Sequence, residues 1–130
     1  MNIQASGVTQ SFIDALKQLE DDQDTGAIAE LFSDDATLER LTHKTYKGKA
    51  DALAFWREYL EPFEKISTTF FNVTEGNDSA VLEWESKGTL KGGKEISYRG
   101  ASSFDVLDGK VTSFRTYYDS AMFVPESSKS

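Results

Sequence analysis

The sequence contains no cysteine and a single histidine, His43, and these absences remove whole classes of chemistry. Without cysteine, the chain can form neither a disulfide nor a thiolate ligand for a metal ion. One histidine is also too few for a zinc site built mainly from imidazole ligands. We therefore expect neither a bound metal nor a cofactor in this protein.

Basic residues are scarce as well, with 14 Lys and Arg against 22 Asp and Glu, for a net charge of −8. An acidic chain without a basic run lacks the electrostatic footprint of a nucleic-acid-binding protein, and anionic membrane surfaces would repel it. No apolar stretch approaches the ~20 residues that a membrane-spanning helix needs. The first residues have neither the basic region nor the apolar core of a signal peptide. These observations predict a cytoplasmic protein without nucleic-acid or membrane partners.

Aromatic residues, by contrast, are plentiful, at 12% of the 130 residues. They could simply fill a core, or they could also line a cavity for a small molecule, because such pockets are mostly apolar and aromatic. A chain of this length can bury more than half of its unfolded surface as one domain. No linker or repeat divides it, so we expect a single domain over residues 1–130 with a disordered tail over 125–130.

The first half of the chain reads as mostly helical. Apolar residues recur at helical spacing in the first segment, at Val8, Phe12, Leu16 and Leu19. Asp24 can cap a second, short helix, after which Asp34-Asp35 stops the helical pattern and residues 36–41 alternate as a first strand. Residues 46–48 predict a turn into a third helix, which Pro62 limits.

The second half reads as four long strands, over residues 66–74, 80–90, 95–106 and 110–118. Glycine-containing turns separate them, and Asp108-Gly109 between two alternating runs is the strongest short-range signal for a β-hairpin. Successive hairpins give an antiparallel meander. Three helices cannot cover both faces of such a sheet, so we expect an α+β arrangement with the helices on one face.

Three segments carry a family resemblance. Residues 24–39 resemble the second-helix-to-first-strand segment of the nuclear transport factor 2-like superfamily. Tyr46-Lys47-Gly48, and residues 108–111 followed by 115–119, are similar to its SnoaL-like branch. The resemblance spans residues 8–123 and implies a cone-shaped, cystatin-like α+β fold, with three N-terminal helices on the concave face of a curved, mostly antiparallel sheet. It also leads us to expect a cavity inside the cone and a homodimer formed through the exposed face of the sheet.

Ketosteroid isomerases of this superfamily use a tyrosine on the first helix, an aspartate base on the first strand and a protonated aspartate on the penultimate strand. Lining up residues 32–39 and Phe104 places Phe12, Arg40 and Ser102 at those positions. An arginine cannot abstract a proton near neutral pH, because its pKa exceeds about 12. The resemblance therefore does not carry ketosteroid isomerase chemistry to this chain.

Limonene-epoxide hydrolases use an Asp-Arg-Asp set together with a tyrosine and an asparagine that hold a water molecule. Counting back from residues 108–109 places the Arg-x-Asp element near residues 83–85 and the last-strand aspartate on Thr116. The tyrosine and the asparagine fall on Leu38 and Arg40. This catalytic set is missing too, so the resemblance leaves open whether the protein is an enzyme.

Side chains alternate along a strand, so the resemblance also predicts which of them face the cavity. It turns Arg115, Tyr117 and Asp119 to the outer face. Arg40 at the mouth of the cavity and Trp56 on the third helix are further candidates. The predicted ligand-binding residues are Arg40, Trp56, Tyr98, Ser102, Phe104, Phe114, Thr116 and Tyr118.

Two residues are candidates for acid/base catalysis, Glu83 and His43. Glu83 and Glu85 flank Trp84, and the sequence leaves open whether the indole or the two carboxyl groups face inward. An inward carboxylate pair in an apolar cavity would have one pKa raised toward neutrality, as a general acid or base requires. His43 has an unperturbed pKa near neutrality, although a lone loop histidine is more often simply exposed.

The sequence favours a protein that binds a small apolar or aromatic molecule in the cone. Cofactor-independent acid/base activity of the isomerase, cyclase or hydrolase type is compatible with this hypothesis. The alternative is a non-catalytic, dimeric interaction or accessory domain that uses the convex face of the sheet.

Overall fold

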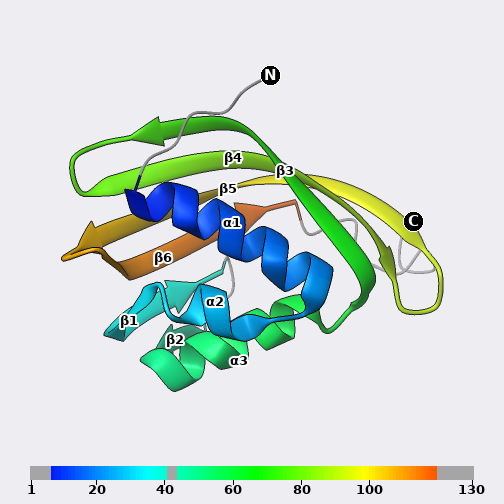
Figure 1. Ribbon diagram of the computed structural model, residues 1–130. Helices are drawn as coiled ribbons and strands as arrows, with labels where there is room; N and C mark the ends of the chain where they lie inside the picture. Colours follow the sequence, from blue (N-terminus) through cyan, green and yellow to red (C-terminus); the bar gives the residue numbers. More distant parts are fainter. Residues whose placement is uncertain (1–6, 41–43, 120–130) are drawn as a thin grey trace.

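The computed structural model describes residues 7–40 and 44–119, in which three helices pack against one face of a curved, six-stranded sheet (Figure 1). The helices are α1 (Gly7–Asp22), α2 (Thr25–Ala29) and α3 (Lys49–Leu60). The strands are β1 (Phe32–Glu39), β2 (Thr45–Lys47), β3 (Phe63–Glu75), β4 (Ser79–Leu90), β5 (Glu95–Leu107) and β6 (Lys110–Tyr118). The predicted tail, residues 125–130, lies outside the described residues.

The sheet is mixed but mostly antiparallel, with the strand order β2-β1-β6-β5-β4-β3. Strands β3 to β6 form the predicted antiparallel meander, and β6 has the predicted bounds. Strand β1 pairs in parallel with β6, which joins the N-terminal half of the chain to the meander. The sheet is therefore built from both halves of the sequence.

Helix α1 crosses the sheet with its apolar face inward, as its residue spacing predicts (Figure 1). Its buried side chains include Phe12, Leu16 and Leu19. Helix α2 starts where expected, because the Asp24 carboxylate accepts a hydrogen bond of 2.9 Å from the backbone N–H of Gly26. Such a cap satisfies one of the N–H groups that the first turn of a helix leaves unpaired.

The first strand differs from the prediction. It begins at Phe32 rather than at residue 36, so Asp34 and Asp35 lie within β1 instead of ending a helix. Its pairing with β6 shifts register between Phe32 and Thr37, which marks an irregularity at the two aspartates. Pairing of Phe32 with Val111 starts the strand early, and the two aspartates fall in the irregular stretch that follows it. The predicted end of the strand, residue 41, lies outside the described residues.

The segment before α3 is also more regular than a simple turn. Residues 45–47 form the short strand β2, which pairs with β1 through contacts such as Leu38 with Tyr46. Gly48 then starts α3 with a φ of 88°, in the left-handed region that glycine adopts without strain. Its N–H donates to the Ala36 carbonyl at 2.8 Å, which holds the start of α3 against β1.

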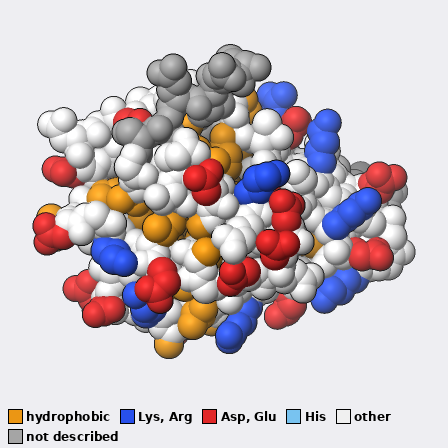
Figure 2. Space-filling view, in the orientation of Figure 1, with side chains coloured by type: hydrophobic (Ala, Val, Ile, Leu, Met, Phe, Trp, Pro, Cys, Tyr) orange, Lys and Arg blue, Asp and Glu red, His pale blue; other side chains and the backbone are white. Residues whose placement is uncertain are grey.

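Two groups of buried apolar side chains form the interior. The larger lies between the three helices and strands β1, β4, β5 and β6, and includes Phe32, Leu38 and Phe104. The smaller joins β3, β4 and β5 and includes Phe63, Trp84 and Tyr98. On the outside, acidic and basic side chains are interspersed over the face shown in Figure 2. Within the described ranges, no helix is long and apolar enough to cross a membrane.

Candidate functional site

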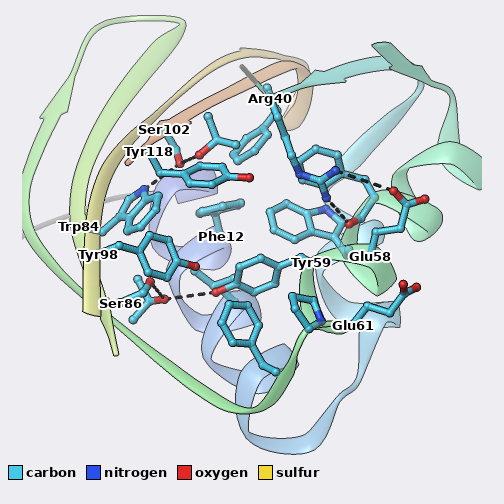
Figure 3. A pocket seen from close by; sticks show the side chains of 18 of the residues that line it. Phe12, Arg40, Glu58, Tyr59, Glu61, Trp84, Ser86, Tyr98, Ser102 and Tyr118 are labelled. Atoms are coloured by element: carbon cyan, nitrogen blue, oxygen red, sulfur yellow. Dashed lines mark hydrogen bonds and ion pairs between the residues drawn. The ribbon is translucent and has the colours of Figure 1, made fainter. Parts of the chain in front are cut away.

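A cavity of about 700 Å³ lies between the two apolar groups, bounded by α1, α3 and the meander (Figure 3). Its walls are mostly aromatic, with a few hydroxyl groups, one arginine and two carboxylates. This size and composition are typical of a small-molecule site.

The structure brings most of the predicted ligand-binding residues to this cavity. The seven that line it are Arg40, Trp56, Tyr98, Ser102, Phe114, Thr116 and Tyr118. Phe104 points to the same face of the sheet but does not line the cavity; it is fully buried, with its ring 5.4 Å from that of Phe12. The alternation was therefore predicted correctly, and Phe104 belongs to the larger apolar group.

On β4, the indole of Trp84 rather than the carboxyl groups of Glu83 and Glu85 faces the cavity. Trp84 is buried and lines the cavity, whereas Glu83 and Glu85 project from the opposite face of the sheet. Glu83 accepts a hydrogen bond of 2.6 Å from the Asn72 side chain, and Glu85 forms an ion pair with Arg99 at 3.4 Å. The inward carboxylate pair is thus ruled out by strand parity. His43, the other catalytic candidate, lies outside the described residues.

The outer-face prediction for the last strand is confirmed for two residues. Tyr117 is 45% exposed. Arg115 forms an ion pair with Asp105 at 3.5 Å and donates to Ser103 at 3.0 Å, all on the face away from the helices. The polar and aromatic end of β6 is therefore divided between the two faces of the sheet.

One polar group on the cavity wall is a short chain across β4, β5 and β6. The Trp84 indole N–H donates to Ser102 Oγ at 3.0 Å, and Ser102 Oγ lies 2.9 Å from Thr116 Oγ1. These three side chains are buried. The hydrogen bonds fix the orientation of the Trp84 ring, which stacks edge-on against Tyr98. This chain holds the wall in shape.

A second polar group surrounds Arg40 at the end of β1. Its guanidinium lies 4.1 Å above the centre of the Phe55 ring and donates to the Phe55 carbonyl at 3.0 Å. It also lies 3.8 Å from the Glu58 carboxylate, and Tyr46 donates a hydrogen bond to that same carboxylate. The side chain is only 16% exposed, so Arg40 is packed and paired rather than solvated in a loop.

The third polar group was not predicted from the sequence, and it centres on Glu20 of α1. Tyr59 donates to Glu20 Oε2 at 2.6 Å. Thr68 of β3 donates to the same oxygen through its hydroxyl at 2.6 Å and to Oε1 through its backbone N–H at 2.9 Å. Ser86 Oγ lies 2.6 Å from the Thr68 hydroxyl, and Tyr98 is hydrogen-bonded to Ser86. In Figure 3, the labelled side chains of Tyr59, Tyr98 and Ser86 converge on one corner of the cavity.

Burial changes the acidity of the groups in this corner. It raises the pKa of Glu20, although the hydrogen bonds from Thr68 and Tyr59 oppose that change. Burial also raises the pKa of Tyr59 and of Tyr98, and the nearby Glu20 adds to both shifts. A charged group loses hydration when it is buried, so each acid holds its proton more tightly. The two phenols therefore stay neutral near physiological pH.

One buried donor has no partner among the described residues, the indole N–H of Trp56. Trp56 lines the cavity, is 3% exposed, and packs against Phe55 and Tyr59. Buried polar groups are nearly always hydrogen-bonded in native proteins. This N–H is therefore a group that an acceptor in the cavity could satisfy.

The residues that sequence reasoning missed are spread over separate elements. Glu20 appears in the sequence as one of several acids at the end of a helix, and Thr68 and Ser86 as ordinary strand residues. Tyr59 could have been found, since it lies three residues after Trp56 and shares its side of α3. Nothing in the sequence spacing indicates that these four side chains meet.

Comparisons with known proteins agree with this geometry. The family model of the SnoaL-like domain matches residues 10–114 of the sequence. No curated protein matches the chain significantly.

Solved structures with the same fold include an NTF2-like protein from Anabaena variabilis, with a TM-score of 0.81 and 25% identity over 88% of this chain and 89% of that one. A protein from Catenulispora acidiphila with a ketosteroid isomerase-like fold, in complex with trimethylamine, has a TM-score of 0.76 and 17% identity over 92% and 97%. An LEH-like epoxide hydrolase from M. tuberculosis has a TM-score of 0.70 and 18% identity over 89% and 84%. With the family model matched over most of its length, the chain belongs to the SnoaL-like domain family.

Proposed function

We propose that this protein binds a small, largely apolar ring-shaped molecule in the cavity of the cone. The observation that carries the proposal is the cavity of about 700 Å³, whose walls are mostly aromatic. A core built only for stability is close-packed, with few voids larger than a water molecule. A cavity of this size inside a small domain therefore favours a ligand over simple packing.

The few polar groups on the wall support the same proposal. The unpartnered indole N–H of Trp56 offers a donor, and the corner around Tyr59 and Ser86 offers hydroxyl groups. Small-molecule sites typically combine apolar walls with a small number of placed polar groups, which set the orientation of the ligand. A structurally similar protein, from Catenulispora acidiphila, is in complex with a small molecule, trimethylamine.

For acid/base chemistry, the corner around Glu20 replaces the sites expected from the sequence. Glu83 lies on the other face of the sheet, and Arg40 is held by Phe55 and Glu58. Glu20 contacts the cavity wall through Tyr59, and its pKa is raised by burial. Cofactor-independent proton transfer to or from a ligand would therefore pass through Tyr59.

The proposal is tested by replacing Tyr118, which lines the cavity beside Trp84 and Tyr98. In a thermal-shift screen of apolar ring compounds, at least one compound should stabilise the wild type, because a ligand that binds only the folded state raises Tm. Tyr118→Ala should weaken the binding of that compound by up to about tenfold, because an aromatic contact is lost. Tyr117→Ala, on the outer face, is the matched control and should bind as the wild type does. Equal binding by both variants would move the site elsewhere.

A second candidate function uses the outer face of the sheet as an interaction surface. Val81 of β4 and Tyr117 of β6 are 40% and 45% exposed on that face. Phe71, which is 37% exposed, lies under the Arg99 guanidinium on the same side. Exposed apolar groups rimmed by charge are typical of protein contacts. We infer that this face forms the expected homodimer.

A further inference from the structure

In the corner of the cavity around Glu20, the donor and the acceptor of each hydroxyl hydrogen bond can be assigned. A carboxylate is an acceptor only, so the three groups that contact Glu20 must all donate to it. The two hydroxyl contacts are short, at 2.6 Å each. Two hydroxyl groups and one backbone N–H thus satisfy Glu20 in its carboxylate form.

Counting protons then fixes the rest of the chain. The single hydroxyl proton of Thr68 goes to Glu20, so Ser86 must be the donor in its contact of 2.6 Å with Thr68. The proton of Ser86 is thereby used, which leaves Tyr98 as the donor in its hydrogen bond with Ser86. The single proton of Tyr59 also goes to Glu20. Every hydroxyl proton of this corner thus runs toward one carboxylate, and none is directed at the cavity.

We propose that Glu20, by accepting the hydrogen bond of the Tyr59 hydroxyl, leaves the oxygen of this cavity-lining phenol as a hydrogen-bond acceptor, so that the site selects ring compounds carrying a hydroxyl donor. The ligand class is a phenol or an enol rather than the corresponding ether or ketone. This inference rests on the proposed function of the same cavity. It adds the chemical group that the ligand presents to one wall.

Burial raises the pKa of Glu20, and the hydrogen bonds from Thr68 and Tyr59 oppose that change in favour of the carboxylate. Asp21 beside Glu20 on α1 raises its pKa, as burial does. Lys65 of β3 and Lys87 of β4 line the surface hollow next to it, together with Glu95 of β5. Burial raises the pKa of Tyr59 as well, so the phenol keeps its proton and continues to donate to Glu20.

A matched pair of probes tests the proposal, 2-naphthol and its methyl ether, 2-methoxynaphthalene. They share the same apolar ring system, and only the first can donate a hydrogen bond. The dissociation constants of both are measured by calorimetry near neutral pH. The dissociation constant of the ether divided by that of 2-naphthol is the ratio compared between proteins. The wild-type ratio should exceed that of Tyr59→Phe by about threefold to tenfold, which is what one neutral hydrogen bond contributes.

Glu20→Gln provides the second variant, and the backbone fixes its orientation. The Thr68 N–H, which now donates to Glu20 Oε1, keeps the amide oxygen at that position. The amide N–H₂ then faces Tyr59 and donates to it, so the phenol proton turns to the cavity. The ether should now bind relatively better, with the ratio at or below that of Tyr59→Phe. Tyr117→Phe, which removes a hydroxyl on the outer face, should keep the wild-type ratio.

The outcomes separate the two proposals. If both probes bind the wild type but its ratio equals that of Tyr59→Phe, the inference is wrong while the proposed function stands. If neither naphthalene binds, the proposed apolar ligand site fails and the inference fails with it. If Glu20→Gln proves too unstable to study, the comparison of wild type with Tyr59→Phe still decides the matter.

Discussion

Gly100 allows β5 to pass the Trp84 ring at the cavity wall. A Cβ at this position would lie 2.6 Å from Cζ2 of Trp84 and 2.3 Å from the backbone carbonyl oxygen of Tyr117. Both distances are well inside van der Waals contact. The ring cannot give way freely, because its N–H is held by Ser102. A single missing side chain therefore sets the position of the indole that lines the cavity.

Replacing this glycine should distort the wall and cost stability. We expect Gly100→Ala to lower the free energy of unfolding by about 1–3 kcal/mol, as overpacking of a buried site usually does. The measurement is urea denaturation followed by tryptophan fluorescence. Gly76→Ala is the matched control, because the nearest contact of its new Cβ is a serine hydroxyl at 3.2 Å. Equal stability of the two variants would contradict the close approach at Gly100.

At the same scale, the cavity walls were predictable where the family resemblance sets the inward face of a strand and alternation gives the rest. Thr116 and Tyr118 line the cavity as their parity predicts, and Tyr117 faces outward. Glu20 was not predictable, because its role depends on Thr68, 48 positions away in the chain. Contacts at such separation come from the tertiary fold and leave no periodic signal in the sequence.

Among the elements, α2 depends most on a single residue. It has only five residues, and an isolated helix of that length is unstable in water. The Asp24 carboxylate accepts from the Gly26 N–H and also from the Gln18 side chain at 3.0 Å. It therefore caps α2 and ties it to the end of α1.

Removing this cap should be measurable in chemical denaturation. We expect Asp24→Ala to lower the free energy of unfolding by about 1 kcal/mol, the usual cost of losing a helix N-cap. Asp22→Ala is the control, since Asp22 is an exposed acid in the last turn of α1, where the helix dipole disfavours negative charge. That control should be neutral or slightly stabilising. A loss of the same size in both variants would contradict the capping role.

The elements also show where local signals stop being sufficient. The hairpin at residues 108–109 was predicted with the right strand bounds for β6, because its turn residues and alternation agree. Strand β1 was predicted to start late, because Asp34 and Asp35 favour a turn locally. Pairing with β6 extends β1 back to Phe32, and only the assembled sheet provides that partner.

For the whole molecule, the outer face of the sheet is the expected dimer surface. We predict that light scattering after size-exclusion chromatography gives the mass of a dimer at micromolar concentration. Val81→Lys should shift the protein to the monomer, because it buries a charge without a partner in the interface. Leu107→Lys is the control, as Leu107 is 64% exposed at the end of β5 beside the hairpin turn. A monomeric wild type would refute the prediction.

The sequence by itself determined the class of fold, because helical spacing, strand alternation and glycine turns are local properties that agree along the chain. The family resemblance, together with alternation along the pleat, also gave the face of β5 and β6 that points to the cavity. The tertiary structure alone decided that Trp84 faces inward and that Glu20 meets Tyr59, Thr68 and Ser86 in one corner. The physical reason is that strand parity on β4 and the meeting of three elements depend on long-range packing, which no local pattern records.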